Sequence, residues 1–168
     1  MARTVLIAGG NKGDKESLSK AARELIAERI GEIKLCSSIH RSKPWGFECK
    51  EEFWNQVFEV ETTLSPFELL ESIHHIEHSL GRERELEKQE KLLNGQPYAS
   101  RTMDIDILLY DEITLISEEL QIPHPRLTER EFVLNPLCEI MPQRVEPCSG
   151  VTMRELKQRL LAEQNLKV

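Results

Sequence analysis

The feature that most constrains this chain is the order in which two kinds of apolar pattern follow one another. Short runs with alternating or β-branched apolar residues are interleaved with longer segments whose apolar residues recur at helical spacing. The strand-like runs cover residues 4–8, 33–42, 53–62 and 103–110, and the helical segments cover residues 17–30 and 66–80. The order β-α-β-β-α-β is that of the split βαβ, ferredoxin-like arrangement. We therefore expect an α+β fold with a mainly antiparallel sheet and both of these helices on one face.

Helix starts are marked by a serine or threonine followed three residues later by a glutamate, the spacing of a capping box. The chain has three such pairs: Ser65 with Glu68, Thr128 with Glu131, and Thr152 with Glu155. The last two predict extra C-terminal helices near residues 129–140 and 153–164. Residues 82–100 are densely charged and contain Asn94, Gly95 and Pro97, which predicts a long loop.

Composition excludes several classes of protein. With 168 residues, 39% hydrophobic and 30% charged, the chain fits one globular domain covering residues 1–168. Its net charge of -7 argues against general binding to nucleic acid or to anionic membranes. The four cysteines form no CxxC pair, and the apolar run near the N-terminus is too short for a signal peptide. We expect a cytoplasmic, monomeric protein with reduced thiols.

Two carboxylates, Asp104 and Asp106, interrupt the otherwise apolar run 103–110. Alternation along a strand puts both on one face, with Cα atoms ~6.6 Å apart. Two such charges repel each other unless a positive group lies between them. Hard divalent cations favour carboxylate oxygens, and two metals ~3.5–4 Å apart could bridge the pair. A solvated sheet face is the other reading.

Basic side chains surround this strand in the sequence. Guanidinium groups bind phosphate with two parallel hydrogen bonds, so arginines beside metal-binding carboxylates indicate phosphoryl chemistry. Any single arginine is more often a solvated surface residue. The candidates are Arg82, Arg84, Arg101, His124, Arg126 and Arg130.

Glu77 falls inside the apolar arc of the helix predicted over 66–80. A carboxylate there needs either a buried arginine or a ligand as its partner. The same helix contains His74, Glu77 and His78 in an H-x-x-E-H pattern, the inverted zinc-metalloprotease motif. The histidines of this pattern lie at the edge of the apolar arc or beyond it, and no third ligand can be placed. A zinc protease is therefore the weaker alternative, beside an inactive nucleotide-binding module.

An aromatic side chain and an amide, Phe53 and Asn55, open the strand 53–62 after a segment that contains Trp45 and Phe47. Such a pair suits a flat heterocycle, which stacks on the ring and forms hydrogen bonds with the amide. Packing in the core is the ordinary role of a single phenylalanine.

These residues together resemble the 6-hydroxymethyl-7,8-dihydropterin pyrophosphokinase family of folate biosynthesis, from about residue 4 to residue 142. Residues 101–110 are similar to the family signature R-x-x-D-x-D followed by aliphatics. Residues 123–137, with Pro-His-Pro-Arg at their start, match a second block, and residues 76–84 match a third. Residues 9–11 look like the G-S-N start of the family.

The resemblance implies an enzyme that transfers pyrophosphate from ATP to the pterin hydroxymethyl group and releases AMP. It implies two Mg²⁺ ions as cofactors, held by Asp104 and Asp106. The residues implied in catalysis are Arg82, Arg101, Asp104 and Asp106. Those implied in ATP binding are Glu77, Arg82, Arg84, Tyr98, Arg101, Ile107, His124 and Arg130. Those implied in pterin binding are Ser42, Pro44, Trp45, Phe53, Asn55 and Phe132.

Three departures from the family pattern concern the phosphate loops. Gly10 stands where serine is usual, Pro97 precedes Tyr98 where a charged residue is expected, and the segment between Arg84 and Arg101 is longer than usual. They bear on rate and loop dynamics rather than on the reaction. No fused aldolase or pteroate synthase is visible in the sequence, so we expect the monofunctional form.

Overall fold

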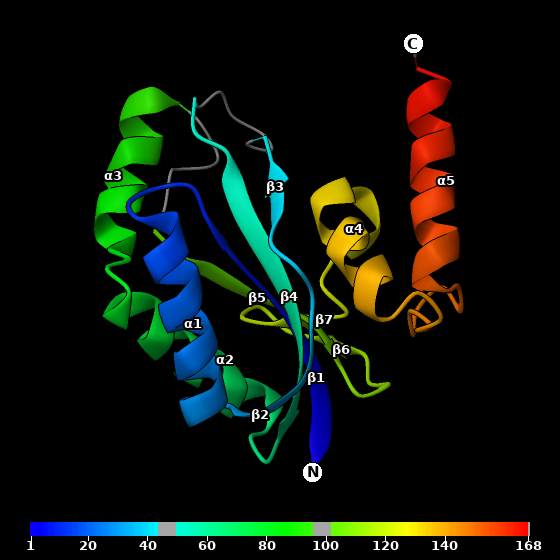
Figure 1. Cartoon of the computed structure of the whole chain (residues 1–168), viewed down its shortest axis with the longest axis horizontal. Coiled ribbons are helices and arrows are strands. Elements are labelled where there is room, and N and C mark those ends of the chain that lie inside the picture. Colours follow the sequence, from blue (N-terminus) through cyan, green and yellow to red (C-terminus); the bar gives the residue numbers. More distant parts are fainter. Residues whose placement is uncertain (44–49, 96–101, 168) are drawn as a thin grey trace.

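The computed structural model describes residues 1–43, 50–95 and 102–167. Within them, five strands form one antiparallel sheet: β1 (Ala2–Gly10), β2 (Gly31–Cys36), β3 (His40–Ser42), β4 (Phe53–Thr62) and β5 (Asp104–Tyr110). The order is β2-β4-β1-β5, and β3 also pairs with β4. This is the predicted ferredoxin-like order, in which the edge strand β5 lies beside β1 (Figure 1).

Helices cover both faces of the sheet. Figure 1 shows α1 (Lys15–Arg29) and α2 (Pro66–Ser79) on one side, with α4 (Glu131–Ile140) and α5 (Met153–Asn165) on the other. The remaining elements are α3 (Arg84–Asn94), the short ribbon of β6 (Leu115–Ile116) and β7 (Gln121–Ile122), and a 3₁₀ turn at Leu127–Glu129. The two helices of the predicted core share one face, and the extra C-terminal helices cover the other.

The two layers explain why the central strands are apolar on both sides. Along β1, Leu6 packs into the α1–α2 core and Ile7 into the α4–α5 core. Phe58 and Val57 divide in the same way on β4. A sheet buried on both faces therefore needs near-continuous apolar strands at its centre.

Two of the three predicted capping boxes are confirmed. At the start of α2 the Ser65 backbone N–H donates to Glu68 at 2.8 Å, and at α5 the Thr152 N–H donates to Glu155 at 3.1 Å. The box at Thr128 is wrong, because Thr128 lies in the 3₁₀ turn and α4 begins at Glu131 after Arg130. The extra turn places Arg130, rather than Thr128, at the N-terminus of α4.

The expectation of a loop over residues 82–100 is wrong for its first half, because residues 84–94 form helix α3. This segment consists mainly of Glu, Lys, Leu, Arg and Gln, which are strong helix formers. Lys88 bonds to Glu85 at 2.8 Å, and Gly95 ends the helix in the left-handed conformation. The dense charge reflects a largely exposed helix rather than a loop.

The strand predicted over 33–42 is split. β2 ends at Cys36 and β3 begins at His40, with the connector Ser37–Ile39 between them. The Ser37 hydroxyl accepts the Val57 N–H at 2.9 Å, so a side chain replaces one backbone partner and interrupts the ladder. Within the described residues, no helix combines the length and apolar character needed to cross a membrane.

Candidate active site

A cavity of about 560 Å³ opens at the β5 edge of the sheet, between the strands and the N-terminal end of α4. Many of the residues singled out from the sequence line it. These are Ser42, Phe53, Asn55, Glu77, Arg82, Asp104, Asp106, Ile107, His124, Arg130 and Phe132. They come from β3, β4, α2, the connection between α2 and α3, β5, the segment after β7 and α4, so only the folded chain brings them together.

The remaining predicted site residues cannot be placed. Pro44, Trp45, Tyr98 and Arg101 lie outside the described residues. Arg84 is the first residue of α3, and its side chain is likewise outside the described part.

Asp104 and Asp106 lie on one face of β5, as alternation predicts. Ile105 and Ile107 between and after them pack into the α1–α2 core, so the two carboxylates point away from that core. Their side chains are 26% and 34% exposed, which leaves them accessible from the cavity.

Arg82 is buried among carboxylates. Its Nε donates to Glu87 at 2.8 Å, and its Nη1 donates to Asp104 at 2.6 Å and also to Glu77. Burial by itself disfavours the charge, but Asp104, Glu87 and Glu77 outweigh it and raise the pKa of the guanidinium. Arg82 is thus a fixed positive charge beside the aspartate pair.

Glu77 has the buried arginine that its position in the helix required. It is 1% exposed, and besides Arg82 it accepts the backbone N–H of Ile105 at 3.2 Å. His74 and His78 are exposed, whereas Glu77 between them is buried against Arg82. In the described ranges, no group of three or more His, Cys, Asp or Glu side chains is arranged to hold a metal.

His124 faces Asp106 across the cavity, with Nε2 3.7 Å from Oδ2. Its Nδ1 accepts the Arg126 backbone N–H at 3.1 Å, which leaves the proton of the neutral ring on Nε2. Burial and the positive charge of Arg130 outweigh the attraction of Asp104 and lower the pKa of His124 to about 4. At neutral pH the ring is therefore an uncharged donor directed into the cavity.

The opposite part of the cavity is built around Asn55, which is 4% exposed. Its amide nitrogen donates to the Ser42 hydroxyl at 2.9 Å. A Cβ on Gly9 would lie 2.3 Å from the Asn55 amide oxygen, so only glycine leaves room for this side chain. Gly9 is thus a site residue whose role was not predicted, although its place at the end of β1 was visible.

Two phenylalanines complete this part. Phe53 lies two residues before Asn55 on β4, and Phe132 lies near the start of α4. The Arg130 guanidinium carbon is 5.5 Å from the centroid of the Phe132 ring, within range of a cation–π interaction.

Glu87, the carboxylate that holds Arg82, was missed because residues 82–100 were predicted to be a loop.

The sequence matches the family model described as 7,8-dihydro-6-hydroxymethylpterin-pyrophosphokinase over residues 5–142. It is 40% identical over 136 residues to 2-amino-4-hydroxy-6-hydroxymethyldihydropteridine pyrophosphokinase of Bacillus subtilis, covering 80% of this chain and 75% of that protein. The protein of the same name from Aquifex aeolicus is 36% identical, covering 94% and 91% of the two chains.

Solved structures show the same fold. The HPPK-DHPS protein of Plasmodium falciparum with pteroate superposes with a TM-score of 0.75 at 14% identity, covering 99% of this chain. This chain spans only 46% of that one, less than half of its length. The family model covers most of the present sequence, and the relatives exceed 30% identity over most of their length. The chain therefore belongs to the 7,8-dihydro-6-hydroxymethylpterin-pyrophosphokinase family.

Proposed function

We propose that this protein transfers pyrophosphate from ATP to the hydroxymethyl group of 6-hydroxymethyl-7,8-dihydropterin, a step of folate biosynthesis. The observation that carries the proposal is that one cavity is lined by two different groups of side chains. Asp104, Asp106 and nearby cations suit a triphosphate, and Asn55 with the phenylalanines suits a flat heterocycle.

In this mechanism the pterin oxygen attacks the β-phosphorus of ATP in line and AMP leaves. Phe53 and Phe132 hold the ring from its two faces, while Asn55 forms hydrogen bonds with its polar edge. Arg82, Arg130 and the uncharged His124 donate to phosphate oxygens, and the two arginines also offset the charge that develops during transfer. Arg84, Tyr98 and Arg101 would extend this phosphate site, and Ser42, Pro44 and Trp45 would extend the pterin site.

The donor set at Asp104 and Asp106 fits Mg²⁺. Two carboxylates on one strand face supply hard oxygen ligands, and Mg²⁺ is commonly held by one or two carboxylates, with phosphate oxygens and water completing its shell. We propose two ions at this pair. When bound, they would neutralise phosphate charge and lower the pKa of the attacking alcohol.

The assay that tests the reaction supplies ATP, Mg²⁺ and the pterin alcohol to purified protein. Release of AMP together with the pterin diphosphate is the expected result. Release of ADP would identify a simple kinase instead, and nucleotide binding with neither product would identify a binding module on this fold.

We further propose that residues 1–168 form one domain, because α5 packs against α4 in the same core that covers β1 and β4. We also propose that the protein is a monomer in the cytoplasm. Sedimentation at several protein concentrations would test the monomeric state. A mass that rises with concentration would contradict a monomer.

A further inference from the structure

Helix α4 contacts two places that matter for the cavity. Phe132 lies near its first residue and lines the cavity, whereas Glu139 lies near its last residue. The two are seven residues apart, almost two full turns, so they share one face of the helix about 10 Å apart along its axis. A contact that holds Glu139 therefore constrains Phe132 through the helix, although Pro136 between them supplies no N–H to the Phe132 carbonyl.

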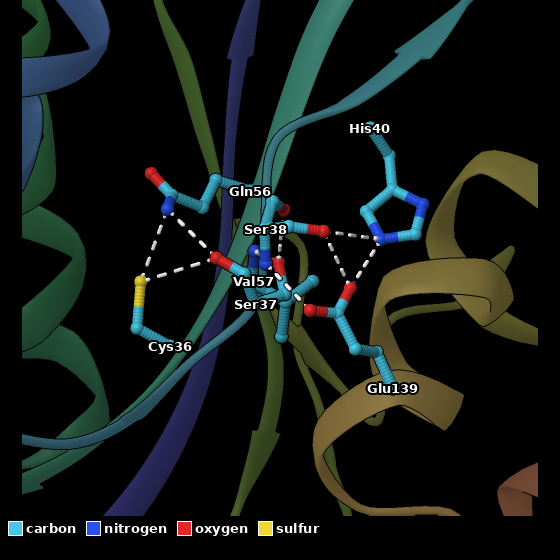
Figure 2. Close-up of polar contacts among 7 residues, drawn as sticks. All are labelled: Cys36, Ser37, Ser38, His40, Gln56, Val57 and Glu139. Carbon is cyan, nitrogen blue, oxygen red and sulfur yellow. Dashed lines mark hydrogen bonds and ion pairs between the residues drawn. The ribbon is translucent and has the colours of Figure 1, made fainter.

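Glu139 is held by Ser38, in the connector between β2 and β3, and by His40, the first residue of β3 (Figure 2). One carboxylate oxygen accepts the Ser38 backbone N–H at 2.8 Å. The other accepts the Ser38 hydroxyl at 2.9 Å and lies 2.5 Å from Nε2 of His40. These bonds, that of His40 first, lower the pKa of Glu139 and keep it ionised.

The connector is fixed to the sheet as well. Ser37 and Val57 exchange two hydrogen bonds, from the Ser37 N–H to the Val57 carbonyl and from the Val57 N–H to the Ser37 hydroxyl, each 2.9 Å long. The Gln56 side chain donates to the Ser37 carbonyl at 2.8 Å (Figure 2). These bonds fix the connector to β4, so Glu139 is tied to the sheet through it.

Strand register places this anchor beside the proposed pterin site. In the pairing of β3 with β4, His40 lies opposite Asn55, and Ser42 lies opposite Phe53. Directly opposed residues project from the same face of a sheet, and so do residues two apart. His40 therefore stands on the same face as Asn55, the face that α4 covers.

We propose that Ser38, His40 and Glu139 form a positioning clasp that sets the separation between Phe132 and the Phe53–Asn55 edge of the sheet. That separation is the width of the slot for the pterin ring, so the inference rests on the proposed function. The clasp residues are positioning residues, because they act through Phe132 and Asn55 rather than by touching substrate.

The test compares Glu139→Ala and Glu139→Gln with Glu131→Gln, an exposed glutamate on the same helix. Pterin affinity is titrated in the presence of a non-hydrolysable ATP analogue, and KM is measured for both substrates. Glu139→Ala should weaken pterin binding about five- to tenfold, with KM for ATP within about twofold of wild type. Glu139→Gln keeps an amide oxygen as acceptor, so its pterin affinity should lie between that of Glu139→Ala and that of wild type. Glu131→Gln should bind pterin as wild type does.

Hydrogen exchange provides a readout that does not depend on activity. Glu139→Ala should speed exchange at residues 37–42 and in α4, and leave β1 unchanged. Unchanged exchange together with wild-type pterin affinity overturns the clasp, while AMP release by the wild type leaves the proposed function standing. If Glu139→Ala weakens the binding of ATP and of pterin equally, the positioning role is overturned. A wild-type protein that neither binds pterin nor releases AMP overturns both proposals.

Discussion

Asp106 is the residue whose loss should best separate catalysis from folding. Its side chain is 34% exposed, and replacing it by alanine removes one of two neighbouring negative charges. We expect the melting temperature of Asp106→Ala apoprotein to equal or slightly exceed that of wild type. Activity should fall about 10³-fold, the effect of losing ~4 kcal/mol of transition-state stabilisation. A folded Asp106→Ala enzyme with near-normal AMP release in Mg²⁺ would refute the metal assignment.

Asp104 should behave differently, although the sequence treats the two aspartates alike. Its carboxylate accepts a hydrogen bond from the buried Arg82 at 2.6 Å. Alanine at this position should therefore cost both activity and stability, and thermal melting of the two apoprotein variants side by side measures the contribution of the Arg82 contact. Equal melting temperatures for Asp104→Ala and Asp106→Ala would contradict that contribution.

Gly9 is the other residue with a sharp expectation. Alanine there would place a methyl group 2.3 Å from the Asn55 amide oxygen, so Asn55 must move or β1 must shift. We expect Gly9→Ala to weaken pterin affinity at least about tenfold, since the amide then no longer faces the ring edge. Gly13 lies outside the cavity lining and has a φ of 80°, so Gly13→Ala is the control for backbone strain: it should cost stability and leave pterin affinity unchanged. An unchanged pterin affinity in Gly9→Ala would show that Asn55 does not form hydrogen bonds with the pterin.

At the scale of elements, Glu77 ties α2 to β5. It is buried and bonds to both Arg82 and the Ile105 backbone N–H. Glu77→Ala leaves that N–H without its carboxylate and Arg82 with one acceptor fewer, and should lower the free energy of unfolding by roughly 2–4 kcal/mol. Urea denaturation measures this, with Glu71→Ala as control because Glu71 is 77% exposed on the same helix. Equal midpoints for the two variants would contradict the role of this tie.

The histidines of α2 provide a test of the zinc alternative. His74 and His78 are exposed, whereas Glu77 between them points inward to Arg82. Replacing both histidines by alanine should leave most pyrophosphokinase activity in place. Stoichiometric zinc in the purified protein that disappears in the double variant, together with activity, would support a zinc enzyme instead.

For the whole molecule, His124 contributes a pH dependence of stability. Its folded pKa of about 4 lies below the ordinary value of 6.5, because burial, Arg130 and Arg126 together outweigh Asp104. Between these pH values the unfolded chain binds the proton more tightly, so the free energy of unfolding falls as pH drops from 6.5 towards 4, by up to ~3 kcal/mol.

The variant that isolates this contribution is His124→Asn, whose amide oxygen can still accept the Arg126 N–H. In metal-free protein, the melting temperature should fall less steeply between pH 7 and pH 4 for His124→Asn than for wild type. Identical slopes would mean that the folded protein does not lower the pKa of this ring.

The sequence alone determined the fold class and the chemistry, because both depend on local patterns. The run 103–110 displays its strand period and its two misplaced carboxylates without reference to any other part of the chain. Ser65 with Glu68 and Thr152 with Glu155 mark helix starts through contacts three residues apart. The family resemblance then implied a role for residues that line the same cavity, including Asn55 and His124.

Only the tertiary structure decided which residues contact one another across the sheet. Dense charge predicts a loop for residues 84–94 against their strong helix propensity, and the bond from Arg82 to Glu87 exists only once α3 is placed beside Arg82. The closeness of Gly9 to Asn55 depends on β1 pairing with β4, and Glu139 meets Ser38 across 101 residues of sequence. Such contacts depend on strand register and helix packing, which are properties of the assembled fold and not of any local segment.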